Sequence, residues 1–492
     1  MLDERPTGAP SVSRDVDVRV VEIVPRQIFA SVGVPRFVNA PPPAHRRVVL
    51  VDLYWTRDKD PRVPLGHASI LATLRARGID VRSLVVAVNE PHLDAAGLCA
   101  AILEHTKGIA PTDVDVAFGA YVWGEALLRD VLRRLRREGF EGRLILGGPQ
   151  ISYSGAGLEH LYPEADAFVR GYGEEALATL AVTPHVHPIA GVHWAGTSDA
   201  VTQATVNLES LPSPWLSGTI PLAGQSFIRW ETQRGCPFRC SFCQHREPGA
   251  RLRRRTLALT RIEAEIDLFC AAGVREIAVL DPIFNVAPHA LAVLHRFADR
   301  GFTGRLSLQC RAEALDDAFL DAASALDVCL ELGLQTIHAH EGRAIQRGNQ
   351  IDRVDAALAG IRARGLSHEV SLIFGLPLQT LASFEASVAW CLAREVPVIK
   401  AFPLLLLRGT ALERDRNQWA LEDGGGPMPM VVRSNSFDLH DWRAMARLSE
   451  ALRLTEGRHP KDLRALRRLA ATLEPDLLRW APSEAQCPEE AA

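Results

Sequence analysis

The sequence lacks any apolar stretch near the ~18 residues that a membrane-spanning helix needs, although 47% of its 492 residues are hydrophobic. Its first residues, Met-Leu-Asp-Glu-Arg-Pro, contain no basic segment followed by an apolar segment, so no secretory signal is visible. The net charge is only −4, too small to attract nucleic acid or an anionic membrane by an overall field. The sequence therefore predicts no nucleic-acid partner and no membrane partner.

Cysteine is also scarce, with nine residues in the whole chain. The number is odd and most positions are far apart, which argues against a framework of disulfides and favours a reducing cytoplasm. We therefore expect a cytoplasmic protein whose few clustered cysteines bind a metal group.

Three cysteines do cluster, because Cys236, Cys240 and Cys243 form a C-x3-C-x2-C pattern within residues 228–247. Three thiolates on one loop can hold three irons of a [4Fe–4S] cube and leave the fourth iron open to a small molecule. The alternative is a zinc site, which needs four sulfur or nitrogen ligands, commonly as two separated pairs. The remaining cysteines form no second C-x2-C pair.

The first part of the chain alternates short apolar runs with helical stretches. The expected strands are 48–54, 81–88, 114–121, 144–146 and 168–169, and the expected helices are 66–77, 93–105 and 126–137. Such alternation indicates βαβ units and a parallel sheet, whose ligand lies beyond the carboxyl ends of the strands. We predict an irregular segment at 1–46 and a doubly wound, Rossmann-like domain at 47–185.

A second alternation follows a predicted linker at 186–224. The expected strands are 227–230, 276–280, 306–310, 328–332, 369–374 and 398–405, with helices at 260–272, 288–300, 316–325, 352–364 and 380–394. Six repeats of this length predict a partial (β/α)6 barrel at 225–410, with its chemistry at the carboxyl ends of the strands. Residues 411–492 are expected to be mostly helical, with helices at 439–453 and 460–480 and a disordered acidic tail at 482–492.

The cysteine spacing, with the aromatic Phe242 before the last cysteine, resembles the radical S-adenosylmethionine (SAM) superfamily. Together with it, the strings 64–66, 147–149 and 173–175 resemble the cobalamin-binding domain of the B12-dependent radical SAM enzymes, over about residues 47–182. The resemblance implies three cofactors: a [4Fe–4S] cluster, SAM and cobalamin. The chain has no D-x-H-x-x-G motif, which implies cobalamin bound without a protein histidine on cobalt.

The same resemblance implies which residues contact the cofactors. Contacts to cobalamin are expected from strand-end residues of the first domain, namely Trp55, Arg57, Gly66, Tyr121, Val122, Gly147, Gly148, Pro149, Gly171, Gly173 and Glu174. Contacts to SAM are expected from Gln309, Arg311, Glu331, Gln335 and Gly375. Arg311 is expected at the SAM carboxylate, and Glu331 or Gln335 at its ribose or amino group. A charged residue in a barrel strand can equally belong to a structural ion pair.

Trp55 and Arg57 are the candidates for the lower face of cobalt, with Arg57 as a catalytic residue. The opposing interpretation is that Trp55 only packs and Arg57 is a solvated loop charge. In the branch of the family that methylates C2 of tryptophan, an arginine lies under cobalamin, and Arg57 is similar in position. The chain thus resembles the class B methyltransferases of this family.

The resemblance implies a C-methyltransferase that uses one SAM to methylate cobalamin and a second to generate a deoxyadenosyl radical, although the tryptophan branch does not start from that radical. The expected partners are a small-molecule or peptide substrate and an external electron donor of the flavodoxin or ferredoxin type. Two alternatives stay open. One is a cyclase or ring-rearranging enzyme with the same cofactors but no net methylation, and the other is a non-catalytic zinc or regulatory protein.

Overall fold

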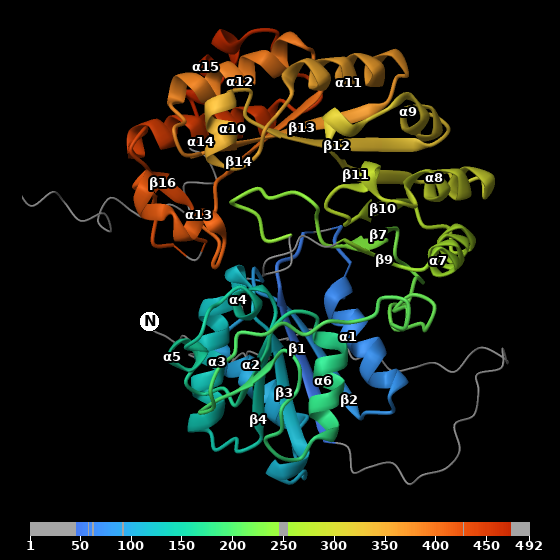
Figure 1. Cartoon of the computed structure of the whole chain (residues 1–492), viewed down its shortest axis with the longest axis vertical. Helices are drawn as coiled ribbons and strands as arrows, with labels where there is room; N and C mark the ends of the chain where they lie inside the picture. The colour runs from blue at the N-terminus through green and yellow to red at the C-terminus, as the bar shows by residue number, and fades with distance from the viewer. Residues whose placement is uncertain are drawn as a thin grey trace, which may run out of the picture.

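The computed structural model describes residues 46–57, 59–61, 63–90, 93–245, 254–426 and 428–473. The predicted irregular segment 1–46, apart from Arg46, and the predicted tail 482–492 lie outside these residues. Two large sheets dominate the molecule, an N-terminal one in blue to teal and a second one in green to orange (Figure 1). In the described part of the chain, every helix is too short or too polar to cross a membrane.

The N-terminal sheet has six strands in the order β2-β1-β3-β4-β5-β6. The first five pair in parallel, and β6 pairs antiparallel with β5. The strands are β1 (Arg47–Tyr54), β2 (Val81–Ala87), β3 (Val114–Gly119), β4 (Arg143–Gly147), β5 (Ala167–Val169) and β6 (Val192–Trp194). The central strands β1 and β3 are apolar and buried along most of their length, as expected for a parallel sheet covered on both faces.

Helices cover both faces of this sheet, which confirms the doubly wound fold. The helices are α1 (Leu65–Ala76), α2 (Ala95–Glu104), α3 (Glu125–Arg137), α4 (Pro149–Ser152), α5 (Leu158–Leu161) and α6 (Gly173–Val182). One core packs α1 and α6 against the sheet, and a second core packs α2 and α3 against its other face. The strand order reverses between β1 and β3, where this type of fold opens a crevice for a ligand.

The second sheet has the order β14-β13-β12-β11-β10-β7, and all of its neighbouring strands are parallel. The strands are β7 (Phe227–Trp230), β10 (Glu276–Val279), β11 (Arg305–Cys310), β12 (Asp327–Gln335), β13 (Ser367–Phe374) and β14 (Val398–Pro403). The helices between them are α7 (Leu259–Ala271), α8 (Ala290–Asp299), α9 (Asp317–Ala323), α11 (Ile351–Ala363) and α12 (Leu381–Ala393). The predicted (β/α)6 arrangement is confirmed.

Three parts of this half differ in detail from the sequence prediction. β12 extends beyond the expected 328–332, with a register shift between Gly333 and Gln335. A short helix α10 (Ala339–Ala344) follows it. Two short strands, β8 (Gln233–Arg234) and β9 (Arg255–Thr256), pair antiparallel on either side of the cysteine loop.

The C-terminal region contains α13 (Ala411–Arg414), β15 (Glu422–Asp423), β16 (Val431–Arg433), α14 (Leu439–Leu454) and α15 (Leu463–Ala470). α14 agrees with the expected helix at 439–453. α15 is shorter than the expected 460–480, of which residues 474–480 lie outside the described part. The predicted linker 186–224 includes β6, which joins the edge of the N-terminal sheet.

Two ion pairs connect the N-terminal half of the molecule with the second half. The loop after β1 contributes Lys59, whose Nζ is 2.7 Å from Glu276 Oε1 at the start of β10. On the other side of the molecule Arg408 donates to Glu125 of α3 at 2.9 Å. These contacts place the carboxyl ends of the N-terminal strands against the open side of the barrel (Figure 1).

Candidate functional site

The cysteine loop follows the first barrel strand, β7, and is anchored by a buried carboxylate. Asp281, just after β10, accepts hydrogen bonds from the backbone nitrogens of Thr232 at 2.7 Å and Gln233 at 3.1 Å, and from the Thr232 hydroxyl. Burial raises the pKa of Asp281 to about 7, whereas these hydrogen bonds act to lower it. The carboxylate thereby fixes the chain just before the first cysteine.

All three cysteines of the loop line one cavity of about 560 Å³ at the carboxyl ends of the barrel strands. Cys236 and Cys240 are buried, and Cys243 is half-buried. Burial raises the pKa of Cys236 and raises that of Cys243 to about 11, while the nearby Arg347 charge acts to lower both. Binding of a metal group would therefore release protons from these thiols.

The three thiols are not gathered as closely as the ligands of one zinc ion. Four ligands at about 2.3 Å around one zinc lie about 3.8 Å apart. Among the described residues, the set of three ligand atoms within 4.8 Å of one another belongs to Asp438, His440 and Asp441, not to the cysteines. Three thiolates on one loop can instead each hold one iron of a cluster.

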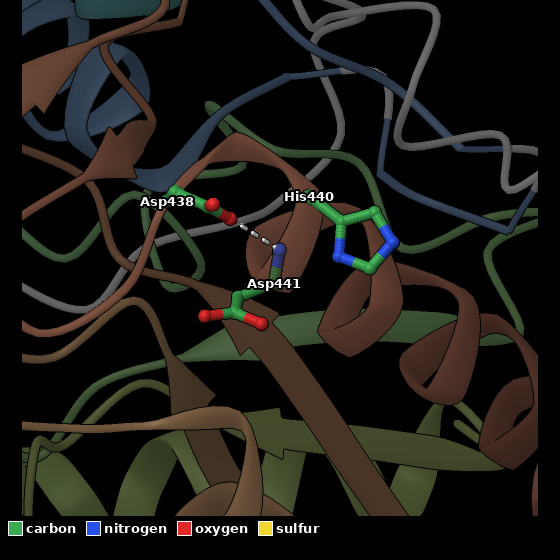
Figure 2. A group of neighbouring side chains, drawn as sticks. All are labelled: Asp438, His440 and Asp441. Atoms are coloured by element: carbon green, nitrogen blue, oxygen red, sulfur yellow. Dashed lines mark hydrogen bonds between the residues drawn. The ribbon is translucent and has the colours of Figure 1, made fainter.

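The Asp438, His440 and Asp441 group has a structural explanation (Figure 2). Asp438 is the N-cap of α14, and its carboxylate accepts a hydrogen bond from the backbone nitrogen of Asp441 at 2.9 Å. Asp438 and His440 are exposed, and exposed acidic groups commonly occur without a metal. We assign no metal to this group.

Four of the five predicted SAM residues line the cysteine cavity: Gln309, Arg311, Glu331 and Gln335. Arg311 lies 4.2 Å from the ring centre of Phe238, and its Nη2 donates to the carbonyl of Gly348 at 2.8 Å. Gln335 adopts a positive φ of 70°, and its buried Oε1 has no hydrogen-bond partner among the described residues. An amide oxygen buried without a partner is costly unless a ligand satisfies it.

Gly375, the fifth predicted SAM residue, does not line this cavity. Its backbone nitrogen donates to Gln379 Oε1 at 2.7 Å, and a Cβ at this position would lie 3.1 Å from the carbonyl of Val431. The glycine at the end of β13 therefore has a packing reason of its own. Its contact with SAM stays a prediction.

Sequence reasoning missed three charged residues of the cavity. Arg347 places Nη1 3.7 Å from Cys240 Sγ and donates through Nη2 to the carbonyl of Gly333. Glu369 of β13 and Lys400 of β14 form an ion pair of 2.5 Å deeper in the barrel. The period-2 alternation of β14 could have indicated Lys400, because the apolar Ile399 and Ala401 flank it, whereas Glu369 stands between His368 and Val370. No sequence signal of this kind marks Arg347, which lies in a loop after α10.

The predicted cobalamin residues surround a second cavity of about 300 Å³ between β1 and β3. Its lining includes seven of them: Gly66, Tyr121, Gly147, Gly148, Gly171, Gly173 and Glu174. Gly148 and Gly171 also line a neighbouring cavity of about 320 Å³, together with Pro149. This neighbouring cavity reaches the cysteine loop at Gln244 and His245.

The three remaining candidates lie elsewhere. Arg57 lines the cysteine cavity, although it belongs to the loop after β1 of the N-terminal sheet. Val122 lines a different cavity of about 370 Å³, between α3 and the segment that follows β14. Trp55 lines none of the four cavities described here. Their roles toward cobalamin stay predictions.

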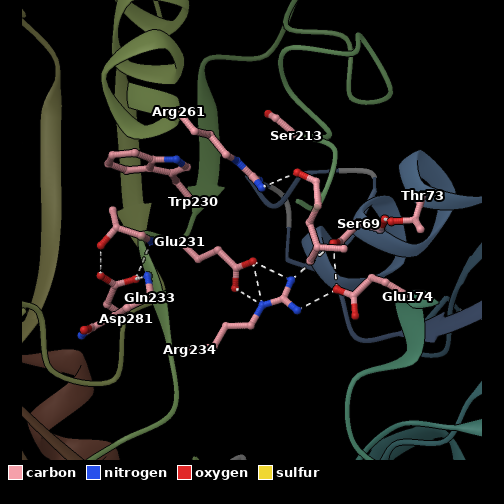
Figure 3. Close-up of polar contacts among 12 residues, drawn as sticks. Ser69, Thr73, Glu174, Ser213, Trp230, Glu231, Gln233, Arg234, Arg261 and Asp281 are labelled. Atoms are coloured by element: carbon pink, nitrogen blue, oxygen red, sulfur yellow. Dashed lines mark hydrogen bonds and ion pairs between the residues drawn. The ribbon is translucent and has the colours of Figure 1, made fainter. Parts of the chain in front are cut away.

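Arg234 connects the cysteine loop with the N-terminal sheet (Figure 3). Its guanidinium donates to Glu174 of α6 at 2.6 Å, to Glu231 at 2.8 Å and to the Ser69 hydroxyl of α1 at 3.3 Å. Burial alone would raise the pKa of Glu174, but the Arg234 charge and hydrogen bonds hold it below its usual value. Arg234 lies two residues before the first cysteine, Cys236. It lines the cavity between β1 and β3 and also the neighbouring cavity of about 320 Å³.

Comparisons with known proteins agree with this arrangement. Residues 230–391 match the family model of the radical SAM superfamily. The chain is 26% identical over 317 residues to the cobalamin-dependent radical SAM methyltransferase TokK of Streptomyces tokunonensis, covering 59% of this chain and 46% of TokK. It is 26% identical over 388 residues to the 2-(S-pantetheinyl)-carbapenam-3-carboxylate methyltransferase of Streptantibioticus cattleyicolor, covering 69% of this chain and 56% of that enzyme. The chain thus spans about half the length of these curated relatives.

Solved structures show the same fold at low identity. The radical SAM methyltransferase TsrM of Kitasatospora setae superposes with a TM-score of 0.61 at 18% identity, covering 76% of each chain. The cobalamin-dependent SAM radical enzyme OxsB superposes with a TM-score of 0.65 at 15% identity, covering 87% of this chain and 72% of OxsB. The combination of doubly wound sheet and partial barrel is therefore shared with both.

Proposed function

We propose that the chain is a cobalamin-dependent radical SAM C-methyltransferase, because residues 230–391 match the radical SAM family model and a curated relative is a cobalamin-dependent radical SAM methyltransferase. It would move a methyl group from SAM, by way of cobalamin, to a carbon of a natural-product, other small-molecule or peptide substrate. Both curated relatives are methyltransferases, which supports methyl transfer. An external electron donor of the flavodoxin or ferredoxin type would supply electrons.

One observation carries the proposal: a single cavity is lined by the three loop cysteines and by Arg57 from the N-terminal sheet. A cluster site and the predicted cobalamin domain therefore open into one space. The cavity also continues toward the strand-end glycines, because His245 and Pro282 line both it and the neighbouring cavity. Proximity of this kind is what methyl transfer between two cofactors and a substrate requires.

The residues present fit the three cofactors. Cys236, Cys240 and Cys243 would hold three irons of the cluster. Arg311 would bind the carboxylate of SAM, and Glu331 or Gln335 its ribose or amino group; the buried Oε1 of Gln335 has no hydrogen-bond partner among the described residues. When bound, the cluster and cobalamin supply the electron transfer and the methyl carrier of the reaction.

The protein's own contribution is to orient groups and to exclude water. Apolar side chains of β13, β14 and the following segment wall one side of the cavity, namely Ile373, Phe402, Leu404, Leu405 and Leu407. Arg311 is held by Phe238 and the Gly348 carbonyl, so its position is set before a carboxylate arrives. Arg347 places a permanent positive charge beside Cys240.

The proposed function is tested with anaerobically reconstituted protein, a reductant, hydroxocobalamin and SAM that carries isotope in its methyl group. We expect about four irons per chain and transfer of the labelled methyl to a product that gains one CH2 unit. A product without added carbon would favour a cyclase instead. Bound zinc without iron and sulfide would indicate a regulatory zinc protein.

The control is a set of cysteine variants. Changing Cys236, Cys240 and Cys243 together to Ala should abolish iron binding and methyl transfer. Cys270→Ala, on α7, should keep both, because Cys270 does not line the cavity. Retained iron in the triple variant would contradict the cluster assignment.

A further inference from the structure

A buried carboxyl group at the end of β1 faces the cavity between β1 and β3 without a hydrogen-bond partner for one of its oxygens. Asp52 is only 4% exposed, and its Oδ1 bonds to nothing among the described residues. Its other oxygen, Oδ2, is 3.8 Å from Nδ1 of His67, which is too long for a hydrogen bond. His67 is itself engaged, with Nε2 2.7 Å from the Ser83 hydroxyl.

The surroundings of Asp52 make this lone oxygen unusual. Most of the cavity wall is apolar, formed by side chains such as Leu50, Ile70, Ala117, Ile145, Val169 and Leu177. The other acidic groups of the wall, Glu174 and Glu231, are both paired with Arg234. A buried polar atom without a partner is rare in folded proteins and points to a ligand that completes the site.

We propose that Asp52 recognises the heterocyclic base of the corrinoid's nucleotide tail, by donating one hydrogen bond from its neutral carboxyl group to the unprotonated ring nitrogen of that base. This inference rests on the proposed function, because it takes cobalamin as the ligand. The apolar wall suits the flat ring, and Asp52 supplies the polar contact at its edge. The ring nitrogen has one lone pair, so the nitrogen that accepts from Asp52 cannot also bind cobalt.

The protonation of Asp52 agrees with a donor role. Burial raises its pKa to about 7. The facing groups from the neighbouring elements do not offset this: burial, then the Arg75 charge, lowers the pKa of His67 on α1 to about 3, and burial raises the pKa of Tyr121 after β3. Arg234 neutralises Glu174 and Glu231 in its own network.

The affinity for cobalamin should depend on pH. If bound cobalamin needs the neutral carboxyl, its affinity is highest below the pKa of Asp52 and falls as the pH rises through about 7. A corrinoid without a nucleotide tail makes no contact with Asp52. Its affinity should not depend on the ionisation of this residue.

The test measures binding of hydroxocobalamin and of cobinamide, which has the same corrin ring but no tail, to full-length protein at about pH 6 and about pH 8. Asp52→Ala should weaken cobalamin about five- to tenfold at the lower pH, the usual loss for one hydrogen bond, and leave cobinamide unchanged. Asp52→Asn keeps a donor of the same shape. It should retain cobalamin binding but lose the dependence on pH.

Comparing hydroxocobalamin with cobinamide distinguishes an error in the role of Asp52 from an error in the proposed function. Equal weakening of both ligands by Asp52→Asn, or a wild-type affinity for cobalamin that is the same at both pH values, would overturn the assignment of Asp52 and leave the proposed function standing. Failure of the wild-type protein to bind either corrinoid would overturn the proposed function itself.

Discussion

Arg347 shows how a single side chain can tune the predicted cluster. Its guanidinium lies 3.7 Å from Cys240 Sγ and is held on its other side by the Gly333 carbonyl. A fixed positive charge beside a cluster ligand favours the reduced, more negative cluster. We expect Arg347→Gln to lower the reduction potential by some tens of millivolts without loss of iron, measured by a redox titration followed by electron paramagnetic resonance.

Arg347→Lys is the matched control, because it keeps the charge. Its potential should lie closer to the wild-type value than that of Arg347→Gln. If both variants lose iron to the same extent, Arg347 holds the loop together and does not tune the cluster.

The adjacent glycines Gly147 and Gly148 both line the cavity between β1 and β3, but only Gly148 has a strained backbone conformation. Gly148 has φ 90°, and a Cβ there would lie 2.9 Å from the Ala120 carbonyl oxygen. Gly147 has no positive φ and room for a Cβ, whose nearest neighbour would be 3.7 Å away. Gly148→Ala should lower the free energy of unfolding by about 1–3 kcal/mol, whereas Gly147→Ala should leave it nearly unchanged.

The measurement is denaturant unfolding together with hydroxocobalamin binding. Both glycines line the cavity between β1 and β3, so both variants should weaken cobalamin if the corrinoid approaches the backbone there. Normal binding by a stable Gly147→Ala protein would place the corrinoid elsewhere.

Single residues were predictable from the sequence where a pattern marks them. The spacing of Cys236, Cys240 and Cys243 and the strand-end position of Gly148 are visible in the sequence. The partnerless oxygen of Asp52 is not, because it depends on which side chains fail to reach it. Arg347 is likewise invisible, since 107 residues separate it from Cys240.

At the scale of elements, the alternation of apolar runs and helices identified the strands of both sheets except β6. That strand has only three residues and lies within a predicted linker, so it is too short to show a period-2 alternation of apolar residues. Its antiparallel pairing with β5 is a tertiary contact that the local sequence does not reveal. The bulge in β12, where Gln335 takes a positive φ, was also missed, because the sequence of the strand continues its alternation.

The Arg234 network is a buried polar connection between α1, α6 and the segment before the cysteine loop. Removing Arg234 leaves the buried Glu174 carboxylate with the Ser69 hydroxyl as its remaining partner in the network. We expect Arg234→Ala to lower the free energy of unfolding by about 3–5 kcal/mol at neutral pH, the usual cost of breaking a buried pair. A double variant, Arg234→Ala with Glu174→Gln, should recover part of this loss.

The loss of unfolding free energy caused by Arg234→Ala should depend on pH. Arg234 holds the pKa of Glu174 below its usual value, so the pair's contribution is present above the unfolded pKa and is lost as the pH falls. The difference in stability between wild type and Arg234→Ala should therefore shrink in acid. A difference that stays constant with pH would mean that Glu174 is not the partner responsible.

At the scale of the whole molecule, the positions of the two sheets depend on contacts that are remote in the sequence. Arg229 of β7 pairs with Asp60 across 169 residues, and Arg408 pairs with Glu125 across 283 residues. Local patterns predict each sheet but carry no information on such pairs. This is why the sequence placed Arg57 at a cobalamin loop and could not place it in the cysteine cavity.

The arrangement of the loop after β1 leads to a prediction for Arg57. The backbone nitrogen of Arg57 donates to Asp60 Oδ2 at 3.1 Å, and Asp60 in turn accepts from Arg229 at 2.7 Å, so the loop is attached to β7. The exposed side chain of Arg57 lines the cysteine cavity. A permanent cation facing cobalt would favour its lower oxidation states, the forms able to accept a methyl group.

We therefore expect Arg57→Ala to bind hydroxocobalamin normally but to slow the transfer of methyl from SAM to cobalamin, followed optically under identical reduction. Arg57→Lys should bind cobalamin and show an altered rate, because Lys is a compact, strongly hydrated charge with a different reach. Lys59→Ala is the control from the same loop, since its ion pair with Glu276 is exposed and contributes little. Equal rates in wild type, Arg57→Ala and Lys59→Ala would make Arg57 an ordinary loop charge, and Trp55 would then become the better candidate for the lower face of cobalt.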